Sequence, residues 1–156
     1  MENYIDIYSK GEYPSNMLSN FYPHAFILDG VACGSMEGFL QALKYKNPKK
    51  QRTVCALTGK QAKEMGARKR LWKWTGRLYW QGKCYKRTSQ DFSLLVFRAY
   101  QALFSQNSDF STALLSTGNA TLDHTIGATN PKKTILTRQE FIAHLTALRN
   151  GGVDEK

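Results

Sequence analysis

The chain has 156 residues, 42% of them hydrophobic and 12% aromatic, which predicts one folded domain and argues against intrinsic disorder. No apolar run approaches the roughly 20 residues that span a bilayer, and the acidic N-terminus lacks the apolar stretch of a secretory signal. The three cysteines, Cys33, Cys55 and Cys84, lack metal-ligand spacing, so we expect reduced thiols in a cytoplasmic protein and no bound metal. No glycine-rich phosphate-binding motif occurs, so we expect no nucleotide cofactor.

The charge is unevenly distributed. The chain carries 22 Lys and Arg residues against 12 Asp and Glu, a net charge of +10. Fifteen of the basic residues and a single acidic one, Glu64, lie between Lys44 and Arg87, so this segment carries +14 and the remainder −4. Such a block is either a lysine-rich solvated surface or a site of attraction to phosphates. Aromatic residues interleaved with it favour the second interpretation, since nucleobases stack on aromatic faces beside positive charge.

The first half of the chain predicts two strands and three helices. Alternating residues 4–8 and the apolar run 25–28 are typical of strands, the second of which runs into an Asp29-Gly30 turn. A helix is expected from Ser35, a suitable N-cap, to residue 45. Two further helices are expected over 48–57, opened by Pro48, and over 60–70.

The second half predicts a hairpin followed by three helices. The hairpin joins residues 77–80 and 83–86, and an amphipathic helix starts at Ser89. A short helix is expected over 108–115, and 116–133 should be a surface loop with little regular structure. The last helix opens with a Thr137–Glu140 capping box and ends at 150–152. We therefore predict a single, mainly helical α+β domain over residues 2–150 with a small β-sheet, and a short flexible tail over 151–156.

The helix expected at 35–45 carries an unusual polar line. Its apolar residues form a core stripe, and Glu37, Gln41 and Lys44 fall on an adjacent arc of about 60°. Glu37 and Lys44 are separated by about 10.5 Å of helix rise, a span that would suit groups reaching two ends of one small ligand. The alternative is an ordinary polar flank of an amphipathic helix.

The residues around this helix resemble the NADAR domain family of YbiA-like N-glycosidases. The resemblance rests on Ser19-Asn20-Phe21-Tyr22-Pro23, Asp29-Gly30, Ser35, Glu37, Gln41 and Lys44. It continues through Ala62-Lys63-Glu64-Met65-Gly66, Trp80, residues 104–107, 114–118 and 148–149, and so covers nearly the whole chain. An Asp-x-x-Trp-Gly stretch that many members carry after the Thr-Gly turn is absent, which leaves the identity of the substrate open.

The resemblance implies a mostly helical fold peculiar to the group and cleavage of an N-glycosidic bond to ribose. The expected partner is ADP-ribosylated nucleic acid, with ADP-ribose released from guanine, or a ribose-phosphate nucleotide; we expect no membrane and no obligate protein partner. Two alternatives stay open: an N-glycosidase acting on phosphoribosylated riboflavin-pathway intermediates, and a module that binds ADP-ribose or nucleic acid without cleaving it.

Two residues are the catalytic candidates. Glu37 could stabilise the positive charge that builds on ribose as the bond breaks, although a glutamate in the first helical turn also suits the helix dipole. For Lys44 the resemblance implies a Schiff base with the ribose C1′, which requires a pKa lowered by burial or by neighbouring cations; we expect nearby Lys46, Lys49 and Lys50 to contribute. The alternative role for Lys44 is a charged phosphate clamp.

The other candidates are substrate-binding residues. Gln41 and Asn20 are expected to bind ribose hydroxyls or to orient Glu37. Phe21 and Tyr22 could flank a base or fill the core, and Asp29 could contact ribose or only form its turn. Trp80, with Trp72 and Trp74 as alternatives, is expected to stack on the base. Lys63, Thr117 and Gly118 follow from the resemblance, and His124 either approaches the site or is an ordinary loop residue.

Overall fold

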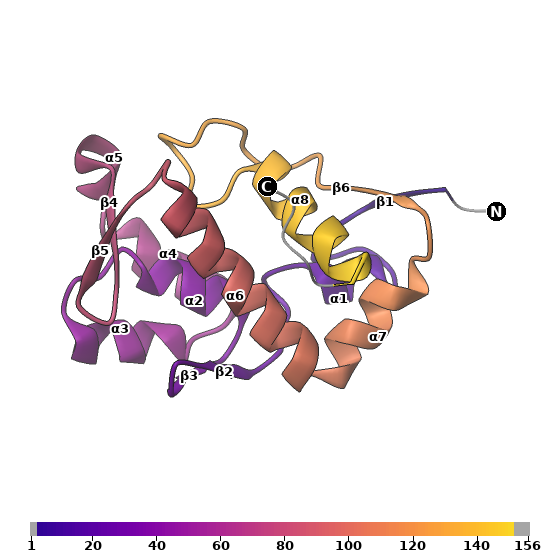
Figure 1. Cartoon of the computed structure of the whole chain (residues 1–156), viewed down its shortest axis with the longest axis horizontal. Helices are drawn as coiled ribbons and strands as arrows, with labels where there is room; N and C mark the ends of the chain where they lie inside the picture. Colours follow the sequence, from indigo (N-terminus) through magenta and orange to yellow (C-terminus); the bar gives the residue numbers. More distant parts are fainter. Residues whose placement is uncertain (1–2, 152–156) are drawn as a thin grey trace.

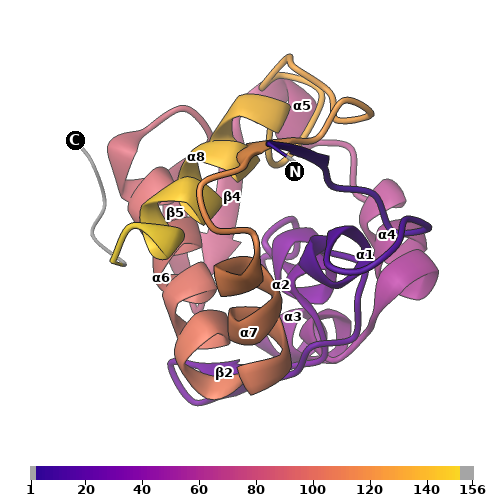
Figure 2. The ribbon, with the colours of Figure 1, turned by 90° about the vertical axis from the view of Figure 1, so that its right-hand side faces the viewer.

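The computed structural model describes residues 3–151, which form eight helices and six short strands (Figure 1). The long helix α6 (Gln90–Gln106) runs through the middle of the molecule, with α2 (Met36–Ala42), α3 (Pro48–Cys55) and α4 (Gly59–Ala67) on one side of it (Figures 1 and 2). Helices α7 (Ser108–Ser116) and α8 (Arg138–Arg149) pack on its other side. The predicted mainly helical α+β class is confirmed. Residues 152–156 of the predicted tail lie outside the described part.

The helices begin where the sequence predicts them. Ser35 caps α2 by accepting a hydrogen bond from the Gly38 amide, and Asn47 caps α3 ahead of Pro48. The capping box at the start of α8 is formed in full, because Thr137 and Glu140 each accept from the other's backbone amide. Two one-turn helices, α1 (Ser15–Leu18) and α5 (Trp72–Thr75), were not predicted.

The strands form three separate pairs rather than one small sheet. Antiparallel hairpins join β2 (Phe26–Leu28) to β3 (Val31–Cys33) and β4 (Arg77–Trp80) to β5 (Lys83–Lys86). The third pair is parallel, β1 (Tyr4–Asp6) with β6 (Thr121–Asp123). The prediction of little regular structure over 116–133 is therefore wrong at β6, a three-residue strand too short to show any periodicity of its own.

The core lies between α2, α6 and the hairpins. Its largest fully buried side chains include Phe39, Phe92 and Tyr100. Helix α2 approaches the end of α3 so closely that a Cβ atom on Gly38 would overlap the carbonyl oxygens of Cys55 and Leu57. This contact leaves no freedom to shift α2, because the opposing atoms are backbone.

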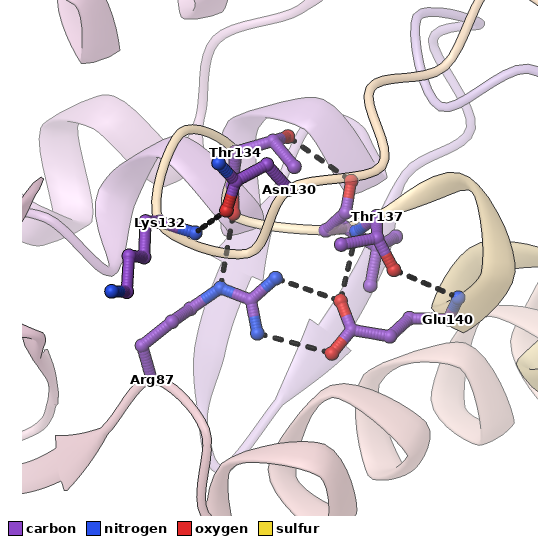
Figure 3. Close-up of polar contacts among 7 residues, drawn as sticks. Arg87, Asn130, Lys132, Thr134, Thr137 and Glu140 are labelled. Atoms are coloured by element: carbon purple, nitrogen blue, oxygen red, sulfur yellow. Dashed lines mark hydrogen bonds and ion pairs between the residues drawn. The ribbon is translucent and has the colours of Figure 1, made fainter.

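A buried arginine fixes the loop that connects β6 to α8. The Arg87 guanidinium donates two hydrogen bonds to the Glu140 carboxylate, at 2.7 and 3.0 Å, and its Nε–H donates to the Thr134 carbonyl at 3.0 Å (Figure 3). Burial alone would raise the pKa of Glu140, but the bonds from Arg87 and Thr137 hold this pKa below its usual value. One side chain thus joins the end of the hairpin to the loop and to the start of α8.

We expect Arg87→Met to lower the free energy of unfolding by about 3 kcal/mol. It would keep the apolar stem of the side chain but remove a guanidinium that is only 2% exposed, with its two bonds to Glu140 and its bond to the Thr134 carbonyl. Denaturant titration measures the change. Arg98→Met is the matched control: its own bidentate pair with Asp29 has side chains 47% and 37% exposed, so its loss should cost less than about 1 kcal/mol. Equal losses for the two variants would contradict this account.

Candidate functional site

A two-lobed cleft lies between α2, α4 and the loop that precedes α8. One lobe has a volume of about 360 Å³ and the other about 290 Å³. The two lobes share six lining residues: Asn20, Phe21, Glu37, Lys63, His124 and Phe141. Lys44 and Gln41 line the larger lobe. The three polar residues predicted from the spacing on α2 therefore meet in one cleft.

Glu37 is a buried carboxylate at the N-terminal end of α2. Only 9% of its surface is exposed, and its Oε2 accepts a hydrogen bond of 2.7 Å from Gln41 Nε2. Its backbone amide donates to the Asn20 carbonyl at 3.0 Å, which ties the loop before β2 to the helix. Burial raises the pKa of Glu37, and the bond from Gln41 and the positive charges of Lys44 and Lys63 oppose this in part.

Lys44 reaches the cleft from the turn that follows α2, two residues beyond the last helical residue, Ala42. Its Nζ donates to the Gly66 carbonyl at 3.3 Å and lies 5.5 Å from the centre of the Trp72 ring. Burial lowers the pKa of Lys44 to about 8; Glu37 works against this shift and Lys73 adds to it. A large fraction of the side chain is therefore a neutral amine near pH 8.

Burial, one of the two predicted causes, is the main cause of this shift, but the neighbouring cation is not one of those predicted. Lys46, Lys49 and Lys50 were expected to lower the pKa of Lys44, but burial and Lys73 do so. Lys46 instead lies over the Tyr79 ring, and Lys49 and Lys50 are exposed on α3, a helix directed away from the cleft. That expectation was wrong because closeness in sequence does not place these side chains beside the Lys44 amine.

Gly66 on α4 positions both Gln41 and Lys44. A Cβ atom at this position would overlap Gln41 Oε1, so only glycine lets the amide lie flat against α4 with its nitrogen toward Glu37. The carbonyl of the same residue accepts from Lys44. Gln41 Oε1 is buried and has no hydrogen-bond partner among the described residues, so packing rather than hydrogen bonding fixes that end of the side chain.

His124 enters the cleft from the end of β6. Its Nδ1 lies 2.8 Å from the Ile7 carbonyl, and because a carbonyl only accepts, Nδ1 carries a proton. In the neutral ring Nε2 is then the acceptor. The ring packs edge-on against Phe141, with 5.2 Å between centroids. Pairing of β1 with β6 thus sets the tautomer and position of this histidine.

Lysines surround the larger lobe. The larger lobe is lined by Lys44, Lys63, Lys73 and Lys133. The Nζ of Lys63 lies 5.9 Å from the centre of the Phe21 ring. Sequence reasoning missed Lys73 and Lys133. Lys73 had a weak signal, because it belongs to the +14 segment beside Trp72 and Trp74, whereas Lys133 gave none.

Five predicted binding residues lie outside the cleft. Asp29 accepts two bonds from Arg98 and one of 2.8 Å from Trp80 Nε1, and Trp80 is buried with its ring against Phe39. These bonds, led by those from Arg98, hold the pKa of Asp29 below its usual value. Tyr22 packs on the ring of His24. The remaining two are Thr117, which accepts from Arg149, and Gly118, in a left-handed turn.

The two alternatives to Trp80 lie nearer the cleft. Trp72 is buried beside the Lys44 amine, and Trp74 is exposed next to Lys73 in the sequence. Figure 1 shows the loop before α8 between α5 and α8, and Lys73 of α5 lines the larger lobe together with residues of this loop.

Comparison with known proteins shows the family. The model of the family described as bacteriophage protein GP30.3 matches residues 12–150. The chain belongs to the GP30.3 family. A relative within it, described as an uncharacterized 17.1 kDa protein in the Gp30–rIII intergenic region of Enterobacteria phage T4, is 37% identical over 147 residues, which is 94% of this chain and 97% of the relative.

The fold is that of YbiA. The NMR structure of the *E. coli* protein YbiA matches with a TM-score of 0.63 and 20% sequence identity, over 96% of this chain and 85% of YbiA. This agrees with the fold that the sequence resemblance implied. No helix in residues 3–151 is long and apolar enough to cross a membrane.

We expect Gly66→Ala to lower the free energy of unfolding by about 1–3 kcal/mol and to raise the pKa of Glu37 further. The new methyl group would displace Gln41, and the displaced amide would no longer stabilise the ionised carboxylate. Denaturant titration and NMR titration of Glu37 measure the two effects.

The double variant Gly66→Ala/Gln41→Ala tests whether the loss of stability comes from overlap of the new methyl group with the Gln41 amide or from a change in the stability of α4 itself. Removing the amide leaves room for the methyl group, so the double variant should lose less stability than the sum of the two single variants. Simple additivity would show that Gly66 does not act through Gln41.

Proposed function

We propose that the protein is an N-glycosyl hydrolase that cleaves a ribose–base N-glycosidic bond and releases ADP-ribose from an ADP-ribosylated guanine in nucleic acid. The observation that carries this proposal is that one cleft contains both a buried carboxylate, from the first turn of α2, and an amine of lowered pKa, from the turn that follows this helix. The resemblance to NADAR N-glycosidases and the YbiA-like fold support it.

Glu37 is the proposed electrostatic catalyst. As the C1′–N bond breaks, its electron pair leaves with the base, which takes up a proton, and positive charge spreads over C1′ and the ring oxygen. A carboxylate already held by Gln41 and shielded from water stabilises that charge with little reorganisation. The Asn20 carbonyl that holds the Glu37 amide and the Gly66 contact that holds Gln41 keep this carboxylate in place.

Lys44 is the proposed nucleophile. Its neutral amine attacks C1′, and the base departs with the electron pair of the old bond. Ring opening then moves a lysine proton to the ribose ring oxygen and leaves an imine between Nζ and C1′. Water adds to the imine carbon and hydrolysis restores the free amine and the sugar. A pKa of about 8 supplies the unprotonated amine that the first step needs.

The lysines of the larger lobe are suited to a diphosphate. Lys63, Lys73 and Lys133 place positive charge around a cleft of the size that holds small ligands in proteins. The +14 segment that contains Lys63 and Lys73 extends this charge over α3, α4 and the β4–β5 hairpin, which favours a substrate attached to a polyanion over a small free metabolite.

We expect Glu37→Gln to lower the rate of ADP-ribose release at least about 100-fold while substrate binding is largely kept. The amide is isosteric but cannot stabilise the developing charge. The measurement is single-turnover release of ADP-ribose, detected by mass, from an oligonucleotide with ADP-ribosylated guanine.

Glu64→Gln is the matched control, because Glu64 is exposed on α4, lines neither lobe of the cleft and pairs with Lys60 at 4.0 Å. It should leave the rate unchanged. An unchanged rate in Glu37→Gln would refute its catalytic role. Tight binding without release by the unaltered protein would favour a non-catalytic binding module.

For Lys44 we expect a covalent adduct when substrate and borohydride are added together. The adduct should increase as pH rises through about 8, because the attacking species is the neutral amine. Lys44→Ala should abolish it and Lys60→Ala, on the exposed face of α4, should not. If no adduct forms and activity falls as pH rises through 8, Lys44 acts in its charged form as a phosphate clamp.

A further inference from the structure

Helix α5 lies at the edge of the molecule (Figure 1), where two large apolar side chains are exposed. Trp74 is 83% exposed and Leu71, just before the helix, is 66% exposed, whereas Trp72 between them is buried and fixes the helix to the core. The helix ends at Gly76, in the left-handed conformation that releases the chain into β4. The indole of Trp74 is thus held out into solvent on a short, anchored element.

The surroundings of this surface are basic. Arg68, Lys69 and Arg70 precede Leu71, all of them exposed, and Lys73 lies between the two tryptophans. The nearest acidic residue in the sequence on either side is Glu64 or Asp91. An exposed indole in a setting of one sign of charge is suited to a partner that combines flat aromatic groups with negative charge.

The surface adjoins the cleft. Lys73 lines the larger lobe and assists the pKa shift of Lys44, and the next residue along the chain is Trp74. Trp74 itself does not line either lobe, so it can meet only a part of the substrate that extends out of the cleft past Lys73. Only an unpaired base can stack there, because a base within a duplex has both faces covered by its neighbours.

We propose that Trp74 and Leu71 form a stacking platform for an unpaired nucleobase next to the modified nucleotide, with Lys69, Arg70 and Lys73 along the phosphates. The substrate is then single-stranded nucleic acid. This inference rests on the proposed function for the occupant of the cleft, whereas the platform itself requires only an unmodified strand. Base stacking, which the sequence predicted for Trp80 with Trp72 and Trp74 as alternatives, is thereby assigned to Trp74, at a position outside the cleft.

The test uses an unmodified single-stranded oligonucleotide and the full chain. Its binding should quench tryptophan fluorescence, since Trp74 is the exposed indole while Trp72 and Trp80 are buried. Trp74→Ala should weaken binding roughly tenfold, within the range for loss of one base–aromatic stack, and Trp74→Phe should restore most of it. Ile27→Ala, an exposed apolar residue on β2, is the matched control and should bind like the unaltered protein.

Three results would overturn the platform: equal binding by Trp74→Ala, duplex binding as tight as that of the single strand, or a Trp74-dependent association with anionic lipid vesicles but not with oligonucleotide. The proposed function can fail separately. If no ADP-ribose is released but unmodified strands still bind through Trp74, the platform stands and the glycosidase does not. With active enzyme, Trp74→Ala should raise KM for a modified oligonucleotide more than for ADP-ribosylated guanosine.

Discussion

Burial of a carboxylate at the start of α2 is the constraint on which the site depends. The same low-dielectric surroundings raise the pKa of Glu37 and lower that of Lys44, and each charge partly offsets the cost of the other. The helix is held on two sides by glycines. Gly38 admits the backbone of α3, and Gly66 admits the side chain of Gln41. The polar line therefore faces a cleft because backbone contacts prevent α2 from turning it toward water.

Local signals made much of the fold predictable. Caps, prolines and an amphipathic face lie within a few residues of the element they define, which is why the start of α3, the Thr137–Glu140 box and the β4–β5 hairpin were predicted closely. The parallel pairing of β1 with β6 was not predicted, because it joins Tyr4 to Thr121 and no residue near either strand indicates which strand it pairs with.

The candidate site divides in the same way. Glu37, Gln41 and Lys44 could be grouped from helical spacing alone, since α2 carries the first two and the helical backbone of its C-cap, Leu43, leads directly to Lys44. Asp29 accepts hydrogen bonds from Trp80 and from Arg98 instead of lining the cleft, and an Asp-Gly turn gives no sign of a partner 69 residues away. Lys133 was missed for the converse reason: its loop is placed by the Arg87–Glu140 pair, which only the folded chain brings together.

The stretch between β6 and α8 forms one wall of the cleft without any helix or strand of its own. Two bidentate ion pairs fix its ends: Asp123 at the end of β6 pairs with Arg138, and Glu140 in the first turn of α8 pairs with Arg87. Its exposed lining residues, such as Ala128 and Lys133, can change in size without disturbing the helix that carries Glu37, whereas Ile135 is buried in the core. Substitutions at the exposed positions can therefore change which molecules enter the cleft while Glu37 and Lys44 keep their positions.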